Sequence, residues 1–352
     1  MPDERVTSAI ANWAPRFTSQ GVDYNDFVRT TRRIEGWNDW CREWCATGDM
    51  HTALAHPAYE KGNRISAGEA FVAAALCYHF AKFMFQDHPG EYKAAGRKSI
   101  EAFAQGLRLL DPSGVRIEIP FEGAILYGTL RRPQGADRPP LVLLLPGLDS
   151  TKEEFFYWEE VFLKRGLATF SLEGPGQGEC GALMHIRPDY ETAVSAALDF
   201  LGKRKDIDMK RVGMAGVSLG GFYSERAAAF EDRVKAAVGN CGPWSWAECW
   251  PHLPQLSKDA YIYHSGSRDE AEAVKKAGEL SLDGVAQKIK QPLLIIHGKM
   301  DRIVPWEQAK KIAAAVGANA QLALFEDGNH VCNNIPSVYR PLTADWLNEK
   351  LS

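Results

Sequence analysis

The chain has little of what builds a cysteine scaffold or a membrane span. Its seven cysteines are odd in number and include no Cys-x-x-Cys pair, which argues against a disulfide framework and a zinc site. No apolar run approaches the roughly 20 residues that cross a bilayer, and the N-terminus MPDERVTSAI has no basic segment followed by an apolar one. We therefore expect a cytoplasmic protein with no membrane partner and no metal.

The chain also lacks a large excess of charge of either sign. It has 41 Lys and Arg against 45 Asp and Glu, a formal net charge of −4, and its short basic run at 203–205 is flanked by acids. A nucleic-acid partner is therefore not expected. The composition, 45% hydrophobic and 24% charged, is typical of a globular protein, and 352 residues favour one large domain with a smaller one.

Strand patterns are missing from the first hundred residues, which show helical periodicity. Trp37, Trp40 and Trp44 recur at spacings of three and four residues, so they share one helix face. We interpret this face as a packing surface rather than a pocket, and we expect its partner at the rim of the functional site. The turn cluster DPSG at 111–114 closes the pattern, which predicts an all-helical N-terminal cap domain over residues 1–112.

Strand patterns begin in the second predicted domain, residues 113–352. Alternation from Val115 to Ile119, a turn at 122–123 and a returning apolar stretch predict a hairpin. Six short apolar runs follow, mostly separated by helical patterns: 141–145, 167–172, 211–216, 235–239, 292–296 and 321–325. Strands apolar on both faces indicate a mostly parallel sheet flanked by helices, so the fold class is α/β. The stretch from about 242 to 289 is too long for a simple connection and is predicted to be an inserted helical cap.

Residues with catalytic chemistry follow several of these runs, at the carboxyl ends where sites of parallel sheets lie. Ser218 stands in GVSLGG, a Gly-x-Ser-x-Gly pattern that exposes a serine on a sharp strand-to-helix turn. Asp301 in HGKMDRIVP and His330 in EDGNH follow two later runs. A serine hydroxyl needs a base to remove its proton, and a histidine needs a carboxylate to orient it. We therefore predict a catalytic triad of these three residues.

Two other residues compete for parts of this triad. Glu248, after the run at 235–239, is a rival carboxylate, but Asp301 lies in the better-formed turn. His297 ends a strand, and its place in His-Gly-x-x-Asp indicates packing beneath that turn.

A tetrahedral oxyanion needs two backbone N–H donors, which we predict from Leu219, after the nucleophile, and Leu148, in the loop after 141–145. Lys152 lies in a stretch with capping-box patterns and is not predicted to be catalytic. The glycine-rich EGPGQGE at 173–179 lacks Gly-x-Gly-x-x-Gly spacing and contains a proline, so no nucleotide cofactor is expected.

Together, Pro146-Gly147-Leu148, EGPGQGE, GVSLGG, HGKMDRIVP and DGNH resemble the α/β-hydrolase superfamily over residues 115–352. That family has the chain order Ser, Asp, His. The helical N-terminal domain, LPGLDSTKEEF and LEGPGQGE resemble a narrower branch, with 2,6-dihydroxypseudooxynicotine hydrolase, fungal polyketide-shortening hydrolases and esterase-like fermentation regulators. Two departures, Pro146 for a common histidine and Glu173 for the usual aspartate, remove no backbone donor and bear on substrate choice.

The branch resemblance implies hydrolysis of a C–C bond beside a ketone, in an aryl ketone or a β-diketone, and it suggests a homodimer. The attacking group would be Ser218 or a water activated by His330. A carbon leaving group needs a proton, for which Glu248 in GPWSWAECW is the candidate donor, with a surface salt bridge as its alternative role. Trp244 and Trp246 are candidates for lining the substrate pocket.

Two alternative functions stay open from the sequence. A carboxylesterase acting on a small ester would use the same nucleophile, base and oxyanion hole. A binding or regulatory protein on a hydrolase scaffold would not need an intact triad, and the intact triad weighs against it.

Overall fold

We describe residues 3–352 of a computed structural model of the chain, which divides into two compact units. The helical unit ends at Gly114 and also takes in the later segment Glu153–Tyr157. The sheet unit consists of Val115–Lys152 and Trp158–Ser352. The division after Gly114 coincides with the turn cluster that closes the helical pattern of the sequence.

The helical unit is built from helices, as its periodicity predicts. These are α1 (Glu4–Ser19), α2 (Tyr24–Arg33), α3 (Trp40–Glu60), α4 (Arg64–Ala81) and α5 (Pro89–Leu110). Its core is aromatic: Phe17 stacks on Phe80 with ring centroids 3.9 Å apart, and the Trp40 indole N–H donates to the Phe80 carbonyl at 2.9 Å. Trp40 and Trp44 are fully buried beside Phe17. The tryptophan face is therefore a packing surface, but its partners lie inside the unit and not at the rim of the functional site.

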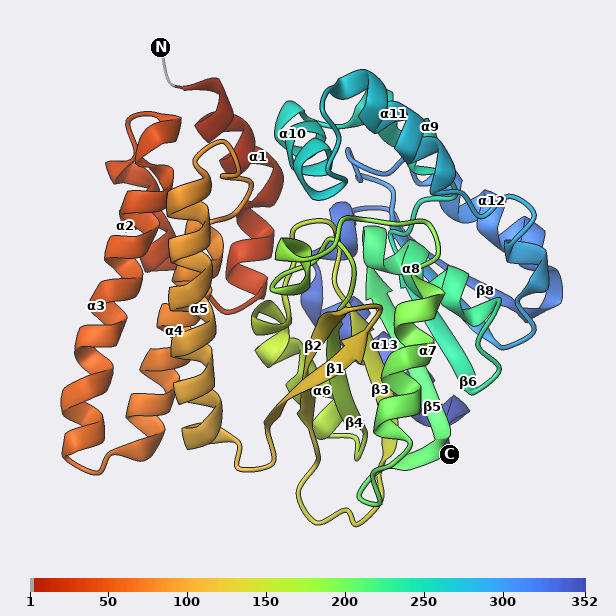
Figure 1. Cartoon of the computed structure of the whole chain (residues 1–352), viewed down its shortest axis with the longest axis horizontal. Helices are drawn as coiled ribbons and strands as arrows, with labels where there is room; N and C mark the ends of the chain where they lie inside the picture. The colour runs from red at the N-terminus through yellow and green to blue at the C-terminus, as the bar shows by residue number, and fades with distance from the viewer. Residues whose placement is uncertain (1–2) are drawn as a thin grey trace. The chain divides into compact units, whose positions relative to one another are not determined.

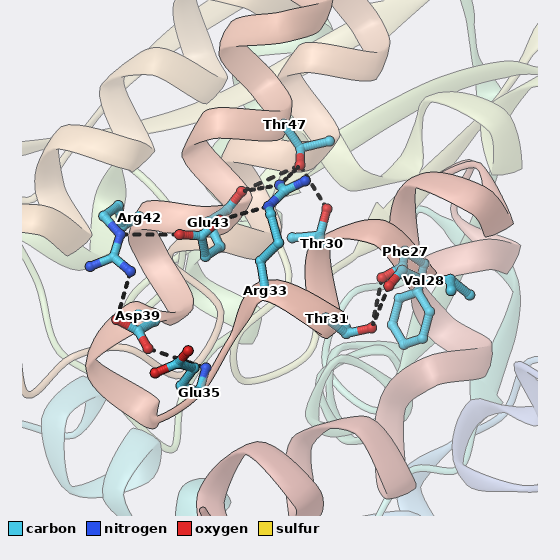
Figure 2. Close-up of polar contacts among 10 residues, drawn as sticks. All are labelled: Phe27, Val28, Thr30, Thr31, Arg33, Glu35, Asp39, Arg42, Glu43 and Thr47. Atoms are coloured by element: carbon cyan, nitrogen blue, oxygen red, sulfur yellow. Dashed lines mark hydrogen bonds and ion pairs between the residues drawn. The ribbon is translucent and has the colours of Figure 1, made fainter.

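Polar contacts fasten α2 to α3 (Figure 2). The Arg33 Nε donates to Glu43 at 2.7 Å, and its Nη2 donates to the Thr47 hydroxyl at 2.9 Å. The same hydroxyl is 2.6 Å from that of Thr30, and both threonines are buried. Because each buried hydroxyl has a partner, the junction of the two helices carries polar groups without a desolvation penalty.

A buried ion pair joins α1 to the segment Glu153–Tyr157. The Arg16 guanidinium donates through Nε and Nη2 to the two oxygens of Glu154, at 2.6 and 2.7 Å. His79 of α4 has its Nε2 3.2 Å from the same carboxylate. Burial alone would raise the pKa of Glu154, but Arg16 and His79 outweigh it and hold that pKa well below its ordinary value. The carboxylate is thus ionised inside the helical unit.

One eight-stranded sheet forms the centre of the sheet unit, in the order β1-β2-β4-β3-β5-β6-β7-β8. β1 pairs antiparallel with β2, and β2 with β4, and the remaining neighbours are parallel. The strands are β1 (Val115–Phe121), β2 (Ala124–Arg131), β3 (Pro140–Leu145), β4 (Ala168–Glu173), β5 (Asp208–Val217), β6 (Val234–Asn240), β7 (Leu293–Gly298) and β8 (Ala320–Phe325). The predicted hairpin and all six predicted apolar strands are present.

Helices cover both faces of this sheet. They are α6 (Phe156–Leu163), α7 (Glu191–Leu201), α8 (Leu219–Ala228), α12 (Glu307–Val316) and α13 (Pro336–Lys350). In Figure 1, α7 and α8 lie in front of the strands and α13 lies behind them. A Cβ at Gly213 of β5 would be 3.0 Å from Leu347 of α13, so the back of β5 is in direct contact with that helix. The fold class is therefore α/β, as predicted.

A helical insertion separates β6 from β7. It contains α9 (Trp246–Cys249), α10 (Gln255–His264) and α11 (Glu270–Glu279), and Figure 1 shows them gathered beyond one end of the strands. Two backbone hydrogen bonds connect the start of this insertion to its end. The Leu282 N–H donates to the Trp244 carbonyl at 2.8 Å, and the Trp246 N–H donates to the Leu280 carbonyl at 3.0 Å. Within residues 3–352, every helix is too short or too polar to cross a membrane.

Candidate active site

Ser218 occupies a strained turn between β5 and α8. Its φ of 56° and ψ of −127° lie in a region that non-glycine residues rarely adopt. The turn is tight: a Cβ at Gly220 would lie 2.1 Å from the Leu145 carbonyl oxygen, so another residue there would collide with β3. The Ser218 N–H donates to the Asn240 carbonyl at the end of β6, at 2.8 Å. This is the sharp, strained strand-to-helix turn that a Gly-x-Ser-x-Gly pattern favours.

The other two predicted residues meet Ser218 at this edge of the sheet. His330 lies in the 3-10 turn His330–Cys332 after β8, and its Nε2 is 2.8 Å from the Ser218 Oγ. Its Nδ1 is 2.7 Å from Oδ2 of Asp301, which follows β7. The contacts from serine to histidine to carboxylate are therefore continuous, although they join residues 112 and 29 positions apart in the sequence.

The environment of Asp301 keeps its carboxylate ionised. The side chain is completely buried, yet Oδ1 accepts the N–H groups of Ile303 and Val304 at 2.8 and 2.9 Å. Burial acts to raise the pKa of Asp301, and His330 and His297 outweigh it, so that the pKa is well below its ordinary value. A fixed negative charge at Nδ1 stabilises a proton on the imidazole.

Three residues that the sequence analysis did not place in the site hold its parts in position. His297 is buried beneath the turn, as expected, but its Nε2 also lies 3.4 Å from Asp301. Asn240 donates from its side chain to the Val331 carbonyl at 3.1 Å, and the Val331 N–H donates to the Cys241 Sγ at 3.2 Å. Both contacts fix the histidine loop to the end of β6. The sequence signal for Asn240 and Cys241 was their position directly after the run at 235–239.

The predicted oxyanion donors flank the serine. Leu219 is the first residue of α8 and Leu148 lies in the loop after β3, and both are buried. A Cβ at Gly147 would be 3.1 Å from Ser218 Cβ and 3.6 Å from its Oγ, so the backbone just before Leu148 lies against Ser218. Backbone N–H groups at such positions can stabilise charge that develops on a carbonyl oxygen attacked by Ser218.

Comparison with known proteins identifies the family of this chain. Residues 154–352, more than half of the chain, match the prolyl oligopeptidase family. Over 345 residues the chain is 34% identical to 2,6-dihydropseudooxynicotine hydrolase of Paenarthrobacter nicotinovorans, covering 97% of this chain and 92% of that protein. The chain belongs to the prolyl oligopeptidase family of α/β-hydrolases.

Other comparisons extend this result. The crystal structure of 2,6-dihydroxy-pseudo-oxynicotine hydrolase matches the α/β-hydrolase described here with a TM-score of 0.89, at 33% identity, over 97% of this chain and 96% of the other. The 20-hydroxy-prefusarin hydrolase FUS2 of Gibberella moniliformis is 36% identical over 241 residues, which cover 64% of this chain and 57% of that protein. The structure of AbyA5, at 17% identity and a TM-score of 0.74, shows the same fold.

Glu248 of this α/β-hydrolase does not have the environment of a proton donor. It lies on α9, and its Oε2 accepts from the Lys311 ammonium at 2.6 Å and from the Gln308 amide at 2.8 Å. Partial burial raises its pKa, but Lys311 and Gln308 outweigh this and the pKa is lowered overall. An ionised carboxylate carries no proton to donate, so the structure favours the salt-bridge alternative for Glu248.

The two candidate pocket tryptophans of the α/β-hydrolase differ in exposure. Trp246 is 1% exposed and packs on Tyr261 of α10, with ring centroids 5.8 Å apart, so it belongs to the core of the helical insertion. Trp244 is partly exposed. Of the two, Trp244 therefore remains the candidate for lining a pocket.

Proposed function

We propose that this hydrolase cleaves a C–C bond beside a ketone, with Ser218 as its nucleophile. The observation that carries the proposal is the 34% identity with 2,6-dihydropseudooxynicotine hydrolase over 97% of the chain. The serine, histidine and aspartate in hydrogen-bond contact support it, because C–C hydrolysis by acyl transfer needs an activated nucleophile.

In the first step, the Ser218 Oγ bonds to the carbonyl carbon and passes its proton to His330 Nε2. The 2.8 Å contact between these atoms supports a direct transfer. Asp301 stabilises the resulting imidazolium through Nδ1, at 2.7 Å. The carbonyl oxygen becomes an oxyanion, and the N–H groups of Leu148 and Leu219 are the proposed donors to it.

In the second step, the tetrahedral adduct collapses and the bond from the carbonyl carbon to its neighbour breaks. The leaving carbon keeps the electron pair, so an aromatic ring or a second carbonyl must delocalise it. We assign its proton to the His330 imidazolium, since Glu248 is held ionised by Lys311. Water, activated by the neutral His330, then hydrolyses the acyl-enzyme to a carboxylic acid and free Ser218.

We further propose a cytoplasmic location and a homodimeric assembly. All seven cysteines are free thiols, six of them buried, which suits a reducing compartment. The dimer is proposed from the branch resemblance alone. Size-exclusion chromatography with light scattering measures the mass in solution, and a monomer at micromolar concentration would contradict the dimer.

The decisive experiment compares substrate classes. The purified enzyme is incubated with aryl ketones, β-diketones and matching aryl esters, and the products are identified by mass. We expect each cleaved ketone to yield a carboxylic acid and a proton-capped aromatic or ketone fragment. Rapid ester hydrolysis without ketone cleavage across the panel would replace the proposal with a carboxylesterase.

A further inference from the structure

The loop EGPGQGE contains a buried glutamine whose contacts lead to the proposed oxyanion hole. Gln177 is 1% exposed and lies after β4. Its amide Nε2 donates to the Pro146 carbonyl at 2.5 Å and to the Gly147 carbonyl at 3.3 Å. Those two carbonyls belong to the loop that follows β3 and precedes Leu148. The Gln177 side chain, from the loop after β4, therefore holds the backbone of the loop after β3.

The orientation of this amide is itself fixed. The Gln177 Oε1 accepts the Gly174 N–H at 2.9 Å and the Tyr190 hydroxyl at 2.7 Å. Tyr190 is buried and stacks on Tyr223 of α8, with ring centroids 3.9 Å apart and planes 6° apart. A flipped amide would place its oxygen against the two carbonyls and its NH₂ against the Gly174 N–H, and so would lose these three contacts; the Tyr190 hydroxyl alone could accept from the flipped group.

Peptide geometry connects these carbonyls to the oxyanion donors. The peptide bonds here are trans, so each C=O points opposite to the N–H of the next residue. With the carbonyls of Pro146 and Gly147 both turned toward Gln177, the N–H groups of Gly147 and Leu148 both turn away from it. Two successive N–H groups facing one side form a concave site for an anion. Gly147 itself lies against Ser218, because a Cβ built on Gly147 would be 3.1 Å from the Ser218 Cβ.

We propose that Gln177 is a positioning residue for catalysis, which aims the N–H groups of the Pro146–Leu148 loop at the oxyanion by holding the two carbonyls behind them. The proposal rests on the proposed serine mechanism and does not depend on whether the bond cleaved is C–C or an ester. Glu173 and Lys152 secure the same loop from its other end: the Glu173 carboxylate accepts from the Lys152 N–H at 3.1 Å and the Glu179 N–H at 3.0 Å.

Gln177→Glu is the informative variant. An ionised glutamate retains an acceptor for Gly174 and Tyr190, but it has no N–H for the two carbonyls and repels them. We expect kcat on an aryl ester at pH 8 to fall about 10- to 100-fold with KM changed less than about threefold, since the donors stabilise the transition state and not the substrate. Burial and the two facing carbonyls should raise the pKa of the new carboxyl well above the ordinary value of a glutamate, so lowering the pH favours the protonated form and restores an O–H donor. The ratio of variant to wild-type kcat should therefore rise at least about fivefold between pH 8 and pH 6.

Two companions complete the experiment. Gln321→Glu makes the same exchange on β8, where the side chain accepts from the Trp346 indole, and should leave kcat unchanged at every pH. Tyr190→Phe keeps the stack on Tyr223 but removes one contact that orients the amide, and should lower kcat about two- to fivefold. If Gln177→Glu does not fold, Tyr190→Phe carries the test, and unchanged kcat in that variant would overturn the proposal.

Ser218→Ala, assayed alongside, separates the two hypotheses. If it retains turnover, the nucleophile assignment fails, whatever the Gln177 variant does. If it is inactive while folded Gln177→Glu has wild-type kcat, or differs in KM alone, the role of Gln177 is refuted and the serine mechanism stands. A kcat loss with no recovery at low pH would also contradict the hydrogen-bond role.

Discussion

Arg16 and Glu154 form a bidentate ion pair across 138 residues of sequence, with side chains only 9% and 0% exposed. Breaking a buried pair by removing one partner is strongly destabilising, at a cost of about 3–5 kcal/mol, because the remaining charge loses its main compensation. We expect Arg16→Met to lower the free energy of unfolding by that amount, as measured by urea denaturation followed by tryptophan fluorescence.

Two controls belong to this prediction. Arg5 and Asp87 form an ion pair with side chains 47% and 41% exposed, and Arg5→Met should cost at most about 1 kcal/mol. The double variant Arg16→Met, Glu154→Leu replaces the pair with apolar groups and should recover much of the loss. Equal losses in Arg16→Met and Arg5→Met would contradict a special role for the buried pair.

The proposed catalytic residues should act as a unit. We expect Ser218→Ala and His330→Ala to lose about 10⁴- to 10⁶-fold in kcat, and Asp301→Asn about 10⁴-fold, while circular dichroism and the melting temperature show folded protein. Near-wild-type turnover in Ser218→Ala would favour direct attack by water that His330 activates.

Removal of residues 1–110 should produce an insoluble or inactive chain. The deletion takes away Arg16 and His79, the partners of the Glu154 carboxylate, and it also removes Phe103, whose ring packs on Phe156 at 6.0 Å. Expression followed by sedimentation and an esterase assay measures the effect. A soluble, fully active fragment would show that the helical unit is dispensable for both folding and catalysis.

Glu225 of α8 should make the protein less stable as the pH rises. Both of its carboxyl oxygens are buried without a hydrogen-bond partner among residues 3–352, and burial raises its pKa well above the ordinary value. The folded state therefore holds a proton that the unfolded chain releases above about pH 4.3. The contribution of this proton to the free energy of unfolding is fully present below that pH. It is lost as the pH rises through the folded-state pKa.

The test of that sign is Glu225→Gln, which cannot ionise. We expect its free energy of unfolding, relative to wild type, to be higher at pH 8 than at pH 4.5, as measured by urea denaturation. Glu326→Gln, at a side chain 81% exposed, is the control. Its free energy of unfolding relative to wild type should not rise between pH 4.5 and pH 8. A pH-independent difference for Glu225→Gln would mean that the folded carboxyl ionises normally.

Glu248→Gln distinguishes the two possible sources of the leaving-group proton. Because Lys311 keeps Glu248 ionised, we expect ketone and ester cleavage to change equally and by less than about threefold. A positioned acid contributes about 10²- to 10⁴-fold, so a selective loss of that size on ketones would assign the proton to Glu248 instead of His330.

Much of the candidate site could be predicted because it depends on local patterns. Ser218, Asp301 and His330 each follow a short apolar strand, and parallel strands bring their carboxyl ends to one edge without any knowledge of long-range contacts. The all-helical start of the chain follows likewise from its three- and four-residue spacing. Each of these predictions uses only residues that lie close to the position in the sequence.

The parts that the sequence could not provide depend on partners far along the chain. Nothing near Glu248 signals that Lys311, 63 residues later, neutralises it. Gln177 stands in a glycine-rich stretch whose apparent analogy is nucleotide binding, and its partners at Pro146 and Tyr190 become visible only in three dimensions. A side chain whose role is to orient a distant stretch of backbone produces no periodic pattern in the sequence.

The inclusion of Glu153–Tyr157 in the helical unit has a consequence for synthesis on the ribosome. When Gly114 has been added, the sequence of all five helices has been translated, but Glu154, whose carboxylate pairs with Arg16, has not. A further 43 residues must be translated to reach Tyr157, which takes roughly 2–9 s at about 5–20 residues per second. During that interval Arg16 lacks the Glu154 carboxylate, so the helical unit cannot reach its final packing around this ion pair until the first strands of the sheet have been translated.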